Sequence, residues 1–540
     1  MKSLFKAIAC LCVFTLGIGA AVAKTSMHKL PAMMLAPNQT DALSPVLSEA
    51  GLPFRVVIER ANFQLPVGFH SGMVGVYKGL WVFIAGRING LHGFGLTNNF
   101  PADTQNTSIY VVNPTTGVTV SRSLNDPSSG LTQRQIDTLT VTSPQGYQEG
   151  DTVIMSGGYG VDTATGTFGT KSVLTSIYLP GIVDWVMQPG NPSFSVAKNI
   201  SQIYNSIFQI TGGDMFKLGN VTQLVFGQNF DGQYTTNSNG NYSDQVRQFQ
   251  IKNVGGQLSV DIYNSKPNSP NQNYRRRDLN VVPVLLNNRN TLQYGLVAYS
   301  GVFTLDSGVW TVPVVIDGTN DPVMADPNLP ATFKQAMNQY VCATANLYSR
   351  KYSSMYHVFF GGISYGFYSN GTFQTDSEIP FINQVTTVKM DKNGNFTQHL
   401  MSNQYPVIPS TGTNPGNPLL FGAGAYFLAN NLSQYPNGVI NLDSIRQSTV
   451  LGYIVGGIQS TVPNTSTNAD SSASPYVFKV TLVPTATRGT AGQSSNALSL
   501  AHVEQPAQQN LRLIAHLGQK YNHKYHESAS QPVRQSRLPA

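Results

Sequence analysis

The chain has 540 residues, of which 11% are charged and 10% aromatic, with 50 Gly and 31 Pro. These values disfavour a mainly helical protein, and 41% hydrophobic residues exclude a disordered chain. The net charge of +7 is concentrated at the ends, because residues 1–23 carry +2 and residues 486–540 carry +4. The +1 left for residues 24–485 gives no sign of a basic nucleic-acid groove, so no nucleic-acid partner is expected.

The N-terminal segment, residues 1–23, has the pattern of a cleaved signal peptide. A basic start is followed by an apolar run over residues 7–20 and by Ala-Val-Ala at 21–23. The run is too short to predict a transmembrane segment. We therefore expect export to a secreted, periplasmic or cell-surface location, with a leader over residues 24–50. Cleavage leaves Cys342 as the only Cys, which predicts a buried thiol and no internal disulfide.

One type of strand recurs along the chain, and it predicts the fold. Each copy is a short apolar run that ends in small residues and precedes a polar stretch rich in Gly and Asn. The copies lie at residues 81–87, 153–160, 223–229, 295–302, 358–364 and 452–459. Their starts are about 60 to 95 residues apart, as expected for four-stranded blades with long loops. Because such a unit cannot bury itself alone, we predict an all-β protein, a six-bladed β-propeller over residues 51–485.

The two ends of this region are predicted to form one blade together. Residues 54–61 alternate like a strand, and residues 418–484 supply three more strands. An N-terminal strand that completes the last blade closes the ring and removes exposed sheet edges. A seventh, degenerate blade between Gly362 and Gly456 is the alternative. Residues 486–540 are predicted to form a flexible basic tail, or a segment that docks on a partner.

Several phrases resemble the kelch repeat of propeller proteins. The second copy has Gly157 and Gly158 after its apolar strand, then Tyr178, then Trp185 seven residues later. Other phrases resemble secreted bacterial kelch-type proteins, within the superfamily that includes the galactose oxidase central domain; they lie at residues 86–94, 147–160, 224–234, 275–283 and 359–364. The resemblance implies a propeller fold and no particular activity. Most copies lack the kelch Trp, and the third and fourth have one Gly of the pair.

We call the six recurring strands the inner strands. The polar and aromatic side chains that follow them are the candidate ligand-binding residues. Loops at these positions converge near the central channel of a propeller. A first cluster is predicted from His70, Arg87, Asn89 and His92, whose two His and one Arg suit an anionic or sugar ligand. Equivalent positions after other inner strands are Tyr159, Gln228 and Asn229, Ile363 to Tyr365, and Gln459. Among them, Tyr159, Asn229, Tyr365 and Gln459 are the ligand-binding candidates. Their rings and amides suit recognition of a sugar or peptide. The alternative is that all of them only satisfy loop backbone groups.

Patterns for catalysis are weak. A copper radical oxidase needs a Cys beside a Tyr and two His, and Cys342 is the only candidate thiol. The sialidase turn occurs once, incompletely, at residues 304–310. Asp231 and Asp306 follow inner strands and are the candidates for a carboxylate pair. The run of arginines at 275–277 is expected in a solvated loop, with one Arg turned inward and paired with Asp278. The alternative is a patch for a nucleic acid or an acidic partner.

The sequence therefore predicts an exported, non-enzymatic binding module, acting as a monomer, that recognises a protein or glycan through its propeller loops. No catalytic residue, metal site or cofactor is predicted. An extracellular carbohydrate-active hydrolase, lyase or oxidase is the alternative, and a purely structural envelope component is a third hypothesis. The candidates for ligand contact come from loops, where rigid scaffolds carry variable binding residues.

Overall fold

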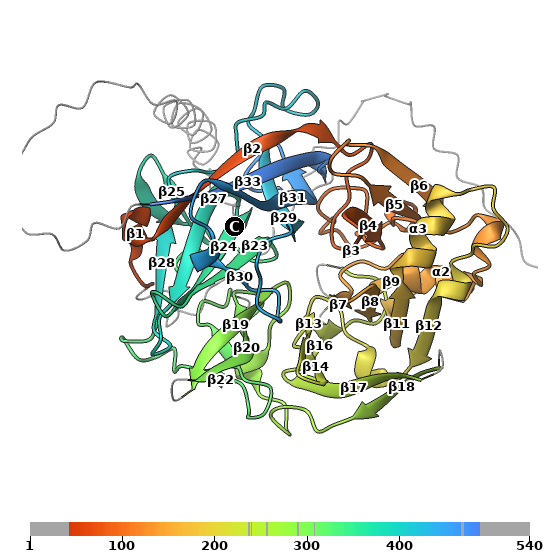
Figure 1. Cartoon of the computed structure of the whole chain (residues 1–540), viewed down its shortest axis with the longest axis horizontal. Coiled ribbons are helices and arrows are strands. Elements are labelled where there is room, and N and C mark those ends of the chain that lie inside the picture. Colours follow the sequence, from red (N-terminus) through yellow and green to blue (C-terminus); the bar gives the residue numbers. More distant parts are fainter. Residues whose placement is uncertain are drawn as a thin grey trace, which may run out of the picture.

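The computed structural model describes residues 43–485 except 236–237, 239, 255–256, 289–290, 307 and 466–468. Its sheets follow one another around a central axis in the order of the sequence (Figure 1). Among the described residues, six sheets have four or more strands. This ring confirms the predicted all-β propeller. The predicted signal peptide, most of the leader and the tail lie outside the described residues.

Four of these sheets have four strands each, neighbours in sequence being neighbours in space. The first contains β3 (Met73–Tyr77), β4 (Leu80–Ile84), β5 (Ser108–Val112) and β6 (Thr119–Ser123). The second contains β7 (Gln145–Glu149), β8 (Thr152–Ser156), β11 (Val173–Tyr178) and β12 (Ile200–Tyr204). The third contains β13 (Asp214–Leu218), β14 (Val221–Val225), β17 (Val246–Val254) and β18 (Gln257–Ile262). The fourth contains β19 (Asn280–Asn288), β20 (Thr291–Tyr299), β21 (Val314–Ile316) and β22 (Val323–Met324).

The last two sheets are larger. The fifth has the order β1 (Val46–Ser48), β28 (Phe396–Leu400), β27 (Phe381–Met390), β24 (Ser354–Ile363), β23 (Ala343–Ser349), β30 (Ile440–Asn441). The sixth has the order β2 (Phe54–Gln64), β33 (Tyr476–Pro484), β31 (Thr449–Ser460), β29 (Leu420–Ala429), with β32 (Ser471–Ala473) also on β31. Strands between Gly362 and Gly456 belong to these two sheets or to the β25–β26 hairpin, and they form no further large sheet among the described residues.

Loops between the second and third strands carry short hairpins. Three two-stranded sheets form there, from β9 (Tyr159–Asp162) with β10 (Thr167–Thr170), β15 (Gln228–Asn229) with β16 (Asn241–Tyr242), and β25 (Gly366–Ser369) with β26 (Thr372–Thr375). Two α-helices are α2 (Gln133–Leu139) and α3 (Leu179–Met187). Single 3₁₀ turns are η1 (Glu49–Gly51), η2 (Ala102–Thr104), η3 (Pro127–Ser129), η4 (Ala197–Asn199), η5 (Ser206–Phe208), η6 (Gln272–Tyr274) and η7 (Leu442–Ser444). No helix of the described residues is long and apolar enough to cross a membrane.

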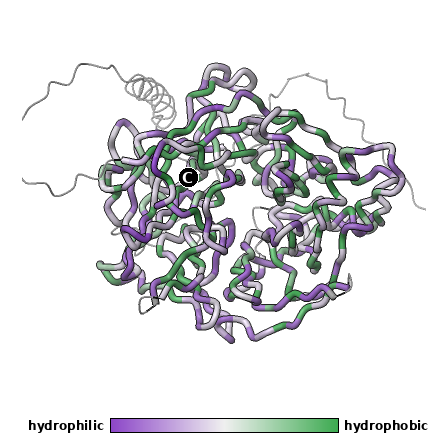
Figure 2. Tube along the Cα trace, viewed as in Figure 1, coloured by the Kyte–Doolittle hydropathy of each residue, from purple (hydrophilic) through white to green (hydrophobic). Residues whose placement is uncertain are grey.

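Hydrophobic cores lie between neighbouring sheets all around the ring. For example, Val82 and Ile84 of the first sheet share a core with Val153 and Met155 of the second. Corresponding clusters join each later pair of sheets and the sixth sheet to the first. Apolar segments therefore recur all around the tube in Figure 2. A strand covered on both faces needs apolar residues at successive positions, which explains why the inner strands read as continuous apolar runs.

The ring closes as the sequence predicts. Strand β2 pairs antiparallel with β33, so that Phe54 faces Pro484 and Ile58 faces Val480. Phe54 is fully buried and its ring meets the edge of Tyr356 in the fifth sheet. Just before β2, residues that were assigned to the leader form β1, which pairs in parallel with β28.

The kelch-like Tyr178 and Trp185 of the second sheet do not pack together between neighbouring sheets, as the pair in that motif was expected to do. Trp185 lies on helix α3 and is fully buried, with its Nε1 donating to Ser128 at 3.1 Å and Arg122 stacked 4.6 Å from its ring. It thus joins the second sheet to the first. Tyr178 is half exposed at the helix start and does not share that contact. Cys342 is buried, as predicted.

Candidate binding site in the central cavity

Each inner strand ends in two consecutive residues with left-handed backbone. These pairs occupy positions 85–86, 157–158, 226–227, 300–301, 361–362 and 456–457. The second residue is always Gly. At Gly86, with φ +84°, a Cβ would lie 2.4 Å from the carbonyl oxygen of His70. Only glycine fits so close to the backbone in this conformation. The first position tolerates Ala85, Phe226 or Ser300, which explains why some copies show a single Gly.

The residue after each pair forms a bridge to a residue that leads into the first strand of the same sheet or, in the sixth sheet, lies within β29. The bridges are His70–Arg87, Thr142–Tyr159, Thr211–Gln228, Arg277–Val302, Tyr340–Ile363 and Ala423–Ile458. All twelve residues line one central cavity of about 200 Å³. Every large sheet therefore delivers two side chains to the same place.

A ring of six residues surrounds this cavity, joined by five backbone hydrogen bonds and open between Asp278 and Val341. It is built from the next residue in each sheet, and all six of these residues have positive φ: Ser71, Ser143, Gly212, Asp278, Val341 and Gly424. Each bond runs from a backbone amide to a backbone carbonyl. The amide of Ser71 donates to the carbonyl of Gly424, Ser143 to Ser71, Gly212 to Ser143, Asp278 to Gly212, and Gly424 to Val341. The ring fixes the wall positions independently of the side chains they carry.

Arg87 contributes a buried guanidinium to the wall, with 2% of its surface exposed. Its Nε donates to Asn89 Oδ1 at 3.0 Å, and its Nη2 donates to the Pro101 carbonyl at 2.8 Å and to Thr104. Phe100 lies 5.2 Å from the guanidinium carbon. Burial lowers the pKa of Arg87 to about 10, so the group is still charged at neutral pH. The predicted alternative, an Arg that satisfies loop carbonyls, is thus realised in part.

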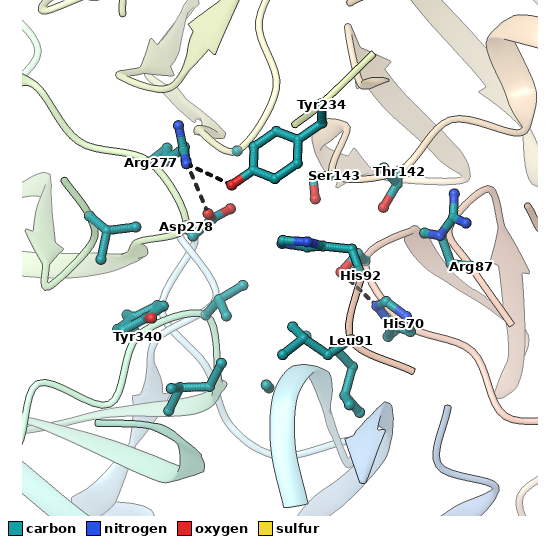
Figure 3. Close-up of a pocket in the computed structure, with 18 of the residues that line it drawn as sticks. His70, Arg87, Leu91, His92, Thr142, Ser143, Tyr234, Arg277, Asp278 and Tyr340 are labelled. Carbon is teal, nitrogen blue, oxygen red and sulfur yellow. Dashed lines mark hydrogen bonds and ion pairs between the residues drawn. The ribbon is translucent and has the colours of Figure 1, made fainter. Parts of the chain in front are cut away.

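Two imidazoles stand beside Arg87 and are neutral. Burial, together with the charge of Arg87, lowers the pKa of His70 to about 3. Burial beneath the surrounding loops, aided by Arg277 and Arg87, lowers the pKa of His92 to about 4. His92 Nδ1 lies 2.8 Å from the Gly93 carbonyl, which can only accept, so Nδ1 carries the proton and Nε2 is an acceptor. Figure 3 shows the His92 ring reaching toward the middle of the cavity.

Opposite His70 and Arg87, the fourth sheet supplies an ion pair. Arg277 Nε lies 3.5 Å from Asp278 Oδ2, and Nη1 donates to Gln228 Oε1 at 2.8 Å and to the Tyr242 hydroxyl at 2.9 Å. Burial raises the pKa of Asp278, and Arg277 opposes this shift. Tyr234 directs its hydroxyl toward Arg277 (Figure 3), at 3.5 Å from Nη2. The charge of Arg277 is therefore compensated within the protein.

Aromatic rings from three loops pack over this polar wall. His92 stacks on Phe100 with centroids 4.6 Å apart and meets Tyr234 edge-on at 4.9 Å. The Tyr159 hydroxyl accepts from the Tyr234 amide at 3.0 Å. Asn99 Nδ2 donates to the Tyr234 carbonyl at 2.8 Å and so ties the first sheet's loop to that of the third. The first-sheet loop thereby reaches across to the third.

The remaining wall, from the fifth and sixth sheets, is apolar. Its bridge positions carry Tyr340, Ile363, Ala423 and Ile458, which belong to one buried cluster with Ile379 and Phe381. Glu378, at the exposed end of this wall, is the acidic exception. The cavity thus has a polar half rich in donors and a smooth aliphatic half.

The structure brings together four of the seven predicted ligand-binding residues. His70, Arg87, His92 and Tyr159 line the cavity. Asn229, Tyr365 and Gln459 are not among its lining residues. Asn229 and Gln459 lie one position past the bridge residue, and Tyr365 two, where the chain has already turned from the cavity. Tyr365 is buried in the neighbouring apolar cluster instead.

Sequence reasoning missed the residues that lead into the first strands. Arg277, Asp278 and Tyr340 line the cavity but were not predicted as ligand contacts. No fixed spacing reveals them. The two bridge partners have the same separation in sequence in each of the first three sheets, which would have located Thr142 and Thr211, but other separations in the fourth and fifth sheets. The expected solvated loop at 275–277 is wrong, because Arg276 is fully buried and Arg277 is 6% exposed. The inward Arg paired to Asp278 is confirmed.

Alternative sites from the sequence are not assembled. Asp231 and Asp306 are exposed and lie off the cavity wall. In the part of the chain that the structure describes, no group of three His, Cys, Asp or Glu side chains is placed to hold a metal.

Comparisons with known proteins leave the family open. No protein family model and no curated protein matches the chain. A solved structure, "Structure of YjhT", aligns over 78% of this chain and 98% of its own, with 11% identity and a TM-score of 0.39. This similarity is too low to support an argument about function. The kelch resemblance stays a prediction.

Proposed function

We propose that this protein is an exported, monomeric and non-enzymatic recognition module, with its six large sheets acting as six blades. Its ligand is one small ring, the terminal sugar of a glycan, held in the central cavity. The main support for this proposal is that the bridge pair of every large sheet lines one cavity of about 200 Å³. That volume is below the roughly 300–1,000 Å³ of drug-sized pockets, so it suits one ring rather than a polymer or a protein surface.

The chemistry of the wall fits such a ring. Aromatic faces at Phe100 and Tyr234 offer flat apolar contact, while His92 Nε2 and the Thr142 hydroxyl offer hydrogen bonds that orient a polar ligand. Glycan recognition is therefore favoured over a protein ligand. Export rests on the predicted signal peptide at residues 1–23, which lies outside the described residues.

Glycan-array binding followed by calorimetry tests the proposal. Phe100→Leu keeps an apolar side chain but removes the flat ring, and we expect at least tenfold weaker binding, about 1.4 kcal/mol. The matched control is Phe373→Leu on the β25–β26 hairpin, whose ring contacts Tyr368 at 5.5 Å and does not line the cavity. Equal losses in both variants, or no saturable glycan binding by the folded protein, would contradict the proposal.

An extracellular carbohydrate-active enzyme is the second candidate, favoured by one observation. Asp278 and Glu378 both line the cavity, and paired carboxyl groups are the usual means of glycoside cleavage. The enzyme hypothesis predicts product release from a glycan that binds, and loss of that release in Glu378→Gln with binding retained. Binding without turnover over a long incubation favours the recognition module.

A further inference from the structure

The charges of the cavity do not balance locally. Four formally charged side chains line it: Arg87, Arg277, Asp278 and Glu378. Arg277 is paired with Asp278, and Glu378 is exposed at the opposite wall. In the described part of the chain, no carboxylate lies within ion-pair distance of Arg87. Arg87 is thus a buried cation whose counter-charge is missing.

Arg87 also keeps part of its hydrogen-bonding capacity. Its Nε and Nη2 donate to neutral acceptors, whereas no protein acceptor is found for Nη1 among the described residues. Asp103, on the exposed 3₁₀ turn η2, stabilises the positive charge of Arg87 electrostatically, from beyond ion-pair distance. A buried guanidinium is expensive to keep without an anion, and carboxylates are its best planar partners.

His70 and His92, the polar neighbours of Arg87 in the cavity, do not compete with it for an anion. Both imidazoles are neutral at physiological pH, so they offer hydrogen bonds without a second positive charge. Apart from Glu378 at its exposed end, the far wall is mainly apolar, with Ile363, Ile458 and their neighbours in one buried cluster. A ligand that fits both walls has one charged end and an uncharged ring.

We propose that the cavity binds a small ring compound with a single carboxylate, and that Arg87 pairs with this carboxylate. The inference rests on the proposed function and adds the ligand class to it. The ring lies against the aromatic rings and the apolar wall, as a uronic acid or an aromatic acid would. His92 Nε2 accepts from a hydroxyl of the ring where one is present.

The test compares ligands that differ only in the acid group. Binding of glucuronate, galacturonate and benzoate to the full protein is measured by calorimetry beside glucose, galactose and benzyl alcohol. We expect at least tenfold tighter binding for an acid than for its neutral partner. In Arg87→Gln we expect the preference to disappear, so that the acid and its neutral partner bind with equal affinity. Arg87→Lys keeps part of the preference.

Control variants separate charge from folding. Arg134→Gln removes a surface cation that stacks 4.0 Å from Tyr204, away from the cavity, and should keep the full preference. Loss of both ligand types in Arg87→Gln would show that Arg87 only supports its loop. Equal binding of acids and neutral sugars would overturn the carboxylate anchor and leave the proposed function intact. If no compound of the panel binds, the proposed pairing of Arg87 with a carboxylate is overturned. The glycan array then tests the proposed function separately.

Discussion

The two halves of the cavity wall have the same backbone and opposite chemistry. On one side, the bridges His70–Arg87 and Thr142–Tyr159 carry charge, imidazole and hydroxyl groups. On the other, Ala423–Ile458 carries only aliphatic groups, although it follows the same left-handed glycine pair. The scaffold therefore fixes where side chains point, and the residue types alone decide what each half can bind. This division predicts that substitutions of the shared glycines destabilise the protein equally in both halves, whereas substitutions of the wall side chains have different effects in the two halves.

The largest effect is expected from the shared backbone. Gly86→Ala and Gly362→Ala place a Cβ 2.4 Å from the His70 carbonyl oxygen and 2.8 Å from Cys342 Cβ, both at positive φ. We expect each to lower the free energy of unfolding by about 3 kcal/mol or more. Gly79→Ala, also at positive φ but with no atom within 4 Å, should cost only about 1 kcal/mol. Urea denaturation gives the free energy of unfolding of all three variants. A small loss in only one of Gly86→Ala and Gly362→Ala would contradict the view that the two halves share one backbone requirement.

A smaller effect is expected from side chains at bridge positions in the two halves. Ile458→Asn places an amide in the aliphatic half, where no acceptor awaits it, and should cost about 2–3 kcal/mol. Thr211→Val in the polar half removes one hydrogen bond, of 3.1 Å to the Ser143 carbonyl, and should cost about 1 kcal/mol. Equal costs in urea denaturation would mean that the two halves do not differ in tolerance for polar groups.

Acid sensitivity is expected mainly from the polar half. His92 has a folded-state pKa of about 4, against about 6.5 when unfolded. The unfolded chain therefore binds more protons between these values, and stability falls as the pH falls through that window, by up to about 1.4 kcal/mol per pH unit.

Comparing a variant with the parent protein isolates this contribution. His92→Gln should lose about 1–2 kcal/mol less than the parent between pH 7 and pH 5, in urea titrations at each pH. The comparison cancels other buried groups, such as Asp214, whose raised pKa of about 7 acts in the opposite direction. Thr211→Val, which adds no titrating group, should show a difference from the parent that does not change with pH.

The fold was predictable because its cause is local and repeated. Apolar runs ending in glycine reflect strands covered on both faces and a turn that only glycine completes, and both are visible in residues 153–158. The cavity was only half predictable. Residues after the glycine pairs can be located from that mark, whereas Arg277 and Tyr340 reach the wall from before the first strand. Their separations from Val302 and Ile363 differ from the one that the first three sheets share, so no fixed offset reveals them.

Closure by β2 and β33 has a consequence for the order of folding. Phe54 and Pro484 are partners although they lie near opposite ends of the described chain, which makes this a very non-local contact. The loop-closure entropy for such a contact is incurred before any stabilising interaction forms, so topologies of this kind fold slowly. As the chain emerges from the ribosome or a translocation channel, β2 must wait with an open edge until the last strand appears. We expect a holding chaperone to bind the chain while the edge of β2 is unpaired. Circular permutation that joins β33 directly to β2 should shorten the time that β2 remains unpaired.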